Sequence, residues 1–223
     1  NFQNPLGYVL SDVDKQKIAQ LAAQYHCIIL EDDIYAECSY QGQRPLPTKY
    51  WDQHGYVVWV GSVSKSLSTA YRVGWFCIGG QLKAMYPEFY SANISVNTPL
   101  QLGLADFIYS REYRNHLSRL QPQLMQQVEQ YRRYILKAFA PLNIGLSQPQ
   151  GGYALWLELP QKIDSLALYL AAQQHQINIV PGVVFGEDER YQHFVRLNAG
   201  HALTPQLQEA ILFLAEWVKQ AVD

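Results

Sequence analysis

The sequence is poor in charge and lacks the segments typical of membrane and secreted proteins. Only 16% of its 223 residues are Asp, Glu, Lys or Arg, against roughly 25% in an average globular protein. No run approaches the roughly 18 apolar residues that a membrane helix needs, and nothing resembles a signal peptide. We therefore expect a cytoplasmic globular protein, with part of its surface covered by something outside this chain.

Several chemistries are missing as well. The formal net charge of −2 gives no electrostatic case for direct nucleic-acid binding. The six histidines have no metal-ligand spacing, and neither a G-x-G-x-x-G motif nor a P-loop is present. The odd number of cysteines, Cys27, Cys38 and Cys77, indicates reduced packing residues and not a disulfide framework.

The stretch from Gly61 to Trp75, GSVSKSLSTAYRVGW, carries the most chemistry. It places Lys65 just after a β-rich run, where lost solvation lowers an amine pKa and favours imine formation. The hydroxyls of Ser62 and its neighbours, with the guanidinium of Arg72, match a phosphate. Together they indicate pyridoxal 5′-phosphate, although a plain serine-rich surface loop explains the stretch equally well when it is taken alone.

A second polar cluster follows the apolar run 27–30, which reads as a strand buried on both faces of a parallel sheet. The segment 31–33 is Glu-Asp-Asp, at the carboxyl end of this strand, where open α/β sheets bind their ligands. Tyr35 stands three residues after Asp32 and could direct its phenol to the same point. Solvated turn residues are the alternative reading of these acids.

Hydrophobic spacing predicts an α/β chain, and the apolar run 27–30 is typical of a mostly parallel sheet. A long helix over 112–139, with Pro122 early in it as a kink or a fresh start, is typical of a link between domains. We place the boundary so that 1–115 is the last part of a large domain and 116–223 is a small α/β domain. The remaining expected helices are 11–25, 81–90, 99–109, 165–175 and 204–221, and the expected strands are 27–30, 56–61, 73–78, 153–159, 177–180 and 194–198.

One cofactor chemistry accounts for the polar residues at the ends of these elements. Pyridoxal phosphate draws electrons from a substrate Cα into a protonated pyridine ring. This requires a carboxylate at the ring nitrogen, for which Asp32 is suited, and benefits from donors to the phenolic oxygen, such as Tyr35 and Asn4. A cation must also hold the substrate carboxylate, and Arg196 is the one charge in a late apolar run.

Five motifs in order resemble the aspartate-aminotransferase superfamily of pyridoxal enzymes, fold type I. They are N-P-x-G at 4–7, D-x-x-Y at 32–35, S-x-x-K at 62–65 with an arginine at 72, P-x-G-G-Y at 149–153 and V-R-L-N at 195–198. The resemblance implies that Lys65 carries the cofactor and moves the Cα proton. It makes Asp32 the ring-nitrogen partner, in preference to Asp33, because the family spaces the acid three residues before the tyrosine. The remaining implied roles are Tyr35 and Asn4 at the phenolic oxygen, Ser62 and Arg72 at the phosphate, and Arg196 at the substrate α-carboxylate.

A finer resemblance is to the aminotransferase-like domain of MocR-type regulators in the GntR group. It rests on the opening F-Q-N-P-L-G, the segment E-D-D-x-Y and the seven-residue spacing from Lys65 to Arg72. It implies a homodimer that senses an amino acid or amine and reaches DNA only through an upstream winged helix. A stand-alone aminotransferase is the alternative, and the site residues are the same in both.

The chain begins at Asn1 inside one of these motifs, so we expect a fragment of a longer protein. In the family, the glycine-rich turn and the aromatic that stacks on the ring come from upstream. The resemblance therefore implies that the chain alone binds the cofactor poorly or not at all.

Overall fold

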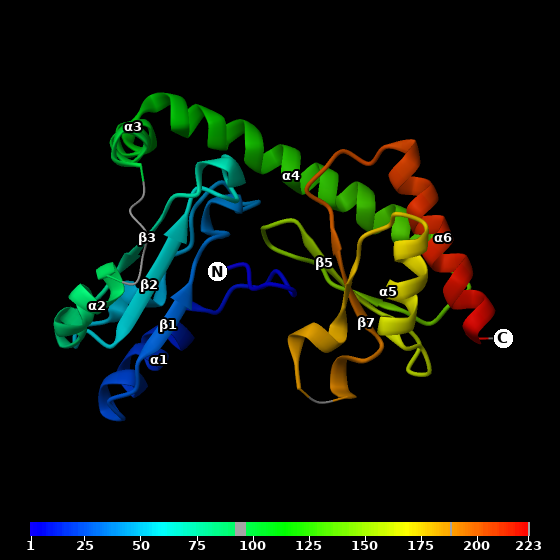
Figure 1. Cartoon of the computed structure of the whole chain (residues 1–223), viewed down its shortest axis with the longest axis horizontal. Coiled ribbons are helices and arrows are strands. Elements are labelled where there is room, and N and C mark those ends of the chain that lie inside the picture. Colours follow the sequence, from blue (N-terminus) through cyan, green and yellow to red (C-terminus); the bar gives the residue numbers. More distant parts are fainter. Residues whose placement is uncertain (92–96, 188, 223) are drawn as a thin grey trace. The chain divides into compact units, whose positions relative to one another are not determined.

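The computed structural model describes residues 1–91, 97–187 and 189–222 (Figure 1). The chain divides into two compact units. The first comprises Asn1–Phe2 and Tyr8–Pro122, and the second comprises Gln3–Gly7 and Gln123–Asp223. No helix in the described part of the chain is both long and apolar enough to cross a membrane.

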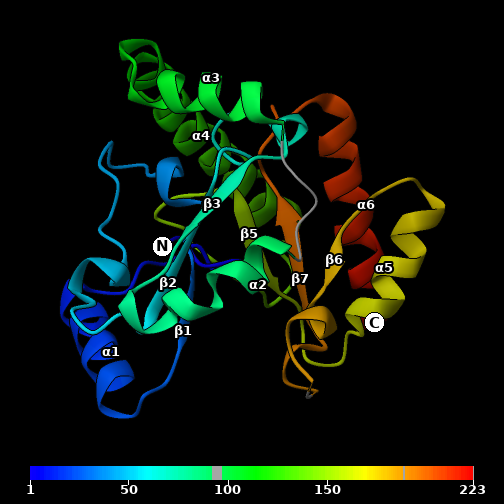
Figure 2. The ribbon, with the colours of Figure 1, turned by 60° about the vertical axis from the view of Figure 1, so that its left-hand side comes forward.

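The first unit is built on a three-stranded sheet, β1 (Ile29–Asp32), β2 (Val57–Ser62) and β3 (Gly74–Cys77), in the order β1-β2-β3. β1 and β2 are parallel, whereas β2 and β3 are antiparallel (Figure 2). The expectation of a mostly parallel sheet is therefore wrong. The reason is the short connection from β2 to β3, because a parallel return needs a crossover of about a dozen residues or more, usually helical.

The expectation that this strand is buried on both faces is also wrong for the described residues. Leu30 is 72% exposed, and Ile28, just before the strand, is 50% exposed. Half-buried and exposed residues alternate along β1, so only one of its faces is partly covered. The strand starts two residues later than expected and includes the first acids. The same correction applies to Cys27 and Cys77, which are exposed; of the three free cysteines only Cys38 is buried.

Side-chain caps precede two helices in the first unit. α1 (Asp12–Gln24) follows Ser11, whose Oγ accepts the Asp14 N–H at 3.1 Å, so the expected cap is confirmed. α3 (Thr98–Tyr109) is capped in the same way by Asn97, and α2 (Tyr86–Ser91) continues the 3₁₀ turn Gly80–Met85. The shorter 3₁₀ turns of this unit are Ala36–Cys38, Thr48–Trp51 and Thr69–Tyr71.

α4 (Arg111–Ala138) is the longest helix, and its residues belong to both units. Pro122 lies inside it and does not end it, although proline has no N–H to bond the carbonyl four residues earlier. The division between the two units falls at this proline.

The second unit contains a four-stranded antiparallel sheet in the order β4-β5-β7-β6. Its core contains the fully buried Leu155, Leu157, Leu168 and Val195. Trp156 stacks on the half-buried Phe194 with ring centroids 5.2 Å apart and meets Phe185 edge-on at 5.1 Å. Figure 1 shows α5 and α6 on one side of this sheet. The elements are β4 (Gly145–Leu146), β5 (Ala154–Glu158), α5 (Ser165–Gln174), β6 (Val180–Pro181), the 3₁₀ turns Gly182–Phe185 and Glu189–Tyr191, β7 (Phe194–Asn198) and α6 (Pro205–Val222).

Candidate functional site

The carboxyl ends of β1 and β2 carry the predicted acid and the predicted lysine. Because the strands are parallel and Asp32 pairs with Val60, Asp32 and the loop after Ser62 lie at the same edge of the sheet. Lys65 is in this loop, and its Nζ lies 5.3 Å from the centroid of the Tyr35 ring. At this distance an ammonium is attracted by the ring face. No carboxylate among the described residues pairs with Lys65, so its amine is available to a ligand.

The two neighbouring acids, Asp32 and Asp33, have different surroundings. Asp33 is 3% exposed, and its Oδ2 accepts from Trp59 Nε1 at 2.7 Å and pairs with Arg44. Asp32 is exposed, and its Oδ1 accepts the Ile34 N–H at 3.1 Å. A buried carboxylate whose partners are already in place serves the fold. Asp32 is the one whose oxygens face solvent and can take a further proton donor.

The predicted phosphate-binding residues, Ser62 and Arg72, differ in how many hydrogen-bond donors they have available for a ligand. Ser62 Oγ lies 2.9 Å from both the Val73 carbonyl and Ser64 Oγ, and it accepts the Ser64 N–H. Since a hydroxyl has one hydrogen, Ser62 must exchange one of these bonds to donate to a phosphate. Arg72 is exposed at a backbone φ of 52°, and no described residue accepts from its guanidinium.

In the second unit, the structure brings Asn4 and Arg196 together. Arg196 Nη1 donates to Asn4 Oδ1 at 3.3 Å, and its guanidinium carbon lies 5.9 Å from the Phe185 ring centroid. The N-P-x-G and P-x-G-G-Y motifs also meet, because the Gln150 N–H bonds the Gly7 carbonyl at 2.9 Å. Residues from the start and the end of the chain thus form one polar surface in this unit.

One buried lysine, Lys15, has a lowered pKa. Burial lowers it, against the opposing charge of Asp12. Its Nζ donates to Asn1 Oδ1 and to the Leu46 carbonyl, each at 2.7 Å. These bonds hold Lys15 in a structural role, so it is no rival to Lys65.

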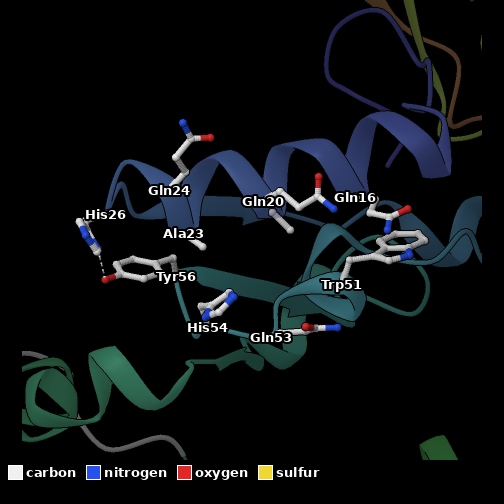
Figure 3. A pocket seen from close by; sticks show the side chains of 10 residues that line it. Gln16, Gln20, Ala23, Gln24, His26, Trp51, Gln53, His54 and Tyr56 are labelled. Carbon is white, nitrogen blue, oxygen red and sulfur yellow. Dashed lines mark hydrogen bonds between the residues drawn. The ribbon is translucent and has the colours of Figure 1, made fainter.

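A groove of about 480 Å³ in the first unit lies between α1 and the residues before β2 (Figure 3). It is at the amino ends of β1 and β2, where His26 Nδ1 lies 2.6 Å from Tyr56 Oη, and therefore away from Asp32 and Lys65. Its lining contains no Asp, Glu, Lys or Arg. It offers no acid, amine or guanidinium for the chemistry that the motifs predict. In the described part of the chain, no group of three or more His, Cys, Asp or Glu could hold a metal ion.

Sequence reasoning missed four residues that hold the lysine loop and the segment after Tyr35. They are Cys38, Tyr113, His116 and Gln121. Their partners lie 27 to 84 positions away in the chain, so no local spacing could have identified them.

Comparison with known proteins identifies the family. Residues 1–212 match the family model for aminotransferase class I and II. The chain is 33% identical to the uncharacterized HTH-type transcriptional regulator YdcR of Escherichia coli over 99% of its own length and 47% of the relative's. It is 29% identical to aromatic-amino-acid aminotransferase 1 of Thermococcus litoralis over 98% of its length and 52% of that enzyme's.

The fold matches part of the fold type I aminotransferases. The crystal structure of the multiple substrate aminotransferase from Thermococcus profundus superposes with a TM-score of 0.83 at 26% identity. All of this chain and 55% of that one are covered. The chain thus spans about half the length of the proteins that it matches. The predicted resemblance to the aminotransferase superfamily is confirmed.

Proposed function

Since the chain belongs to the class I and II aminotransferase family, we propose that its first unit binds pyridoxal 5′-phosphate through Lys65. The observation that carries this is the Lys65 Nζ, 5.3 Å from the Tyr35 ring at the edge where β1 ends in Asp32. When bound, this cofactor supplies an electron sink for bonds at the Cα of an amino acid. An amine without a carboxylate partner, an exposed acid and an exposed guanidinium fit such a group.

In this proposal, Asp32 keeps the ring nitrogen protonated and Tyr35 donates to the phenolic oxygen. The Asp32 contact is a charge-assisted hydrogen bond of about 1.5–3 kcal/mol. The bond from the Ile34 N–H orients the carboxylate and leaves oxygen lone pairs for the ring. Lys65 is proposed as the base that takes a proton from the substrate Cα and returns it, because its amine is released when the substrate takes its place on the cofactor.

Arg72 and Ser62 are proposed to bind the phosphate. The planar guanidinium of Arg72 can donate two parallel N–H bonds to phosphate oxygens, and no described partner competes for it. Ser62 contributes by moving its single hydrogen from the Val73 carbonyl to the phosphate. Binding should therefore rearrange the hydrogen bonds at the start of the lysine loop.

The second unit is proposed to bind the amino acid by its carboxylate through Arg196. A carboxylate can accept two guanidinium N–H groups in parallel, which fixes its orientation. Asn4 uses its Oδ1 to accept from Arg196, so its NH₂ keeps both hydrogens for a further acceptor.

We further propose that the chain is part of the effector-sensing, dimer-forming domain of a MocR-type regulator. The support is its 33% identity to a protein named as a transcriptional regulator, against 29% to a named aminotransferase. DNA contact would then require sequence outside these residues, because the chain carries a net charge of −2. A stand-alone aminotransferase, which moves an amino group to a 2-oxo acid, is the second candidate.

The test is chemical labelling of the intact product of the gene. Pyridoxal phosphate followed by borohydride should modify Lys65 in a peptide map, and Lys65→Ala should abolish this adduct. Lys17→Ala is the matched control, because Lys17 is exposed on α1 and has no proposed role. Equal modification of Lys17 and Lys65 would refute the proposed site. Sustained formation of a 2-oxo acid from added amino acid would identify an enzyme, whereas ligand-dependent DNA binding without turnover would identify a regulator.

A further inference from the structure

The peptide groups at Lys65 and Ser66 are held by side chains that make no proposed contact with the cofactor. On one side is Cys38, in the 3₁₀ turn that follows Tyr35. Its Sγ donates to the Lys65 carbonyl at 3.6 Å, and its side chain is completely buried. Burial raises the pKa of this thiol to about 12, so it keeps its hydrogen at neutral pH.

On the other side is the first part of α4. His116 Nε2 lies 2.6 Å from the Ser66 carbonyl, which can only accept, so Nε2 carries the hydrogen. The buried Tyr113 places its hydroxyl 3.2 Å from Ser66 Oγ. The Tyr113 and His116 rings stack with centroids 6.3 Å apart, which fixes the orientation of the imidazole.

α4 holds the acid-bearing segment as well. Gln121 is 6% exposed, and its Nε2 donates to the Glu37 carbonyl at 3.0 Å. Glu37 is the neighbour of Cys38, so the segment after Tyr35 and the loop of Lys65 are fastened to the same helix and to each other. Buried polar groups of this kind are costly to leave without partners.

We propose that Cys38, Tyr113 and His116 are positioning residues that fix the Lys65 loop against the segment of Tyr35 before any ligand binds. Cys38 and His116 hold the backbone carbonyls of Lys65 and Ser66, and Tyr113 holds the Ser66 hydroxyl, so the amine is presented from a rigid loop. The part that concerns cofactor attachment rests on the proposed function, whereas the rigidity of the loop does not.

The first test is hydrogen exchange of the intact gene product without cofactor. The Leu67 N–H, which bonds the Val63 carbonyl at 2.8 Å, is the reporter for opening of the loop. The loss of one hydrogen bond in His116→Ala should speed its exchange about fivefold to tenfold. His116→Gln, whose amide nitrogen can replace Nε2, should stay within about twofold of the wild type. Unchanged exchange in His116→Ala would overturn the proposal.

The matched controls remove the same groups elsewhere in the first unit. His54→Ala deletes an exposed imidazole, and Tyr109→Phe deletes the hydroxyl of a residue that is 83% exposed. Neither should change exchange at Leu67, whereas Tyr113→Phe should speed it. If His116→Ala fails to fold, the comparison of Tyr113→Phe with its control Tyr109→Phe decides the question. Equal exchange at Leu67 in these two variants would contradict the proposal that the three residues fix the loop.

The second readout is the rate of cofactor attachment at Lys65, measured by borohydride trapping. His116→Ala and Cys38→Ala should slow this rate severalfold, and His116→Gln should restore it. If Lys65 of the wild type is not labelled at all, the proposed function fails. The exchange experiment alone then tests whether the three positioning residues fix the loop. Normal labelling rates in both alanine variants, with a labelled wild type, would remove these residues from any positioning role.

Discussion

Replacing Gly7 with alanine tests the contact between the two motifs of the second unit. Gly7 has a backbone φ of +73°, and an added Cβ would lie 2.3 Å from the Cβ of Pro149 and 3.0 Å from its Cα. The hydrogen bond from the Gln150 N–H to the Gly7 carbonyl fixes this close approach. The substitution therefore carries both a conformational cost and a steric cost.

Both costs can be estimated. The left-handed backbone conformation costs a non-glycine residue about 1–2 kcal/mol. Forcing a methyl group into a packed contact costs about 1–3 kcal/mol. The free energy of unfolding should therefore fall by about 2–5 kcal/mol. Because each kcal/mol lowers Tm by roughly 2–4 °C in a chain of this size, we expect a loss of about 10 °C.

Gly42 provides the matched control for this variant. It has nearly the same φ, +74°, but no atom lies within 4 Å of an added Cβ. Gly42→Ala should therefore show the conformational cost alone, about 1–2 kcal/mol. Calorimetry of both variants measures the difference, with each scored on the transition of its own unit. Equal losses in the two variants would show that the Gly7–Pro149 contact carries no steric cost, contrary to the geometry.

Two further predictions concern titratable groups. Burial acts to raise the pKa of Asp52, but hydrogen bonds from Lys49 and three backbone N–H groups outweigh it and hold the pKa below its usual value. The stability that Asp52 contributes is thus present above about pH 4 and is lost as the pH falls through the folded pKa. Urea unfolding across this range should show the loss. The Asp52→Asn variant should show a smaller loss of stability over the same range. Burial raises the pKa of Cys38 to about 12. Iodoacetamide at about pH 8, below the reference thiol pKa, should therefore modify the exposed Cys27 and Cys77 in the native protein and leave Cys38 intact. Equal labelling of all three cysteines in a mass spectrum would contradict this.

Local sequence signals were sufficient to place Asp32 and Lys65 at the carboxyl ends of two neighbouring parallel strands and to identify the cap of α1. Two parallel strands end at one edge of a sheet, so acids after one apolar run and a lysine after the next should lie close together. Lys65 Nζ lies 5.3 Å from the ring of Tyr35, three residues after Asp32, while the roles of these residues stay predictions. Ser11 was readable as a cap because its partner Asp14 is only three residues away.

Features that depend on distant parts of the chain were not readable. The direction of β3 follows from the length of its connection and not from its apolar composition. The exposure of Leu30 depends on what packs beside β1, which the strand's own residues do not encode. His116 meets Ser66 from 50 positions away, through the packing of α4 against the loop, and a lone histidine in a helical pattern gives no sign of it.

The pairing of Gly61 with Trp75 has a consequence for how this protein can change. The two residues are opposite each other on β2 and β3, and a Cβ at position 61 would lie 2.4 Å from the indole nitrogen. The ring thus occupies the volume of a missing side chain at the start of the lysine loop. In a combinatorial library, folded variants with alanine at 61 should carry a smaller residue at 75. The two positions should therefore covary.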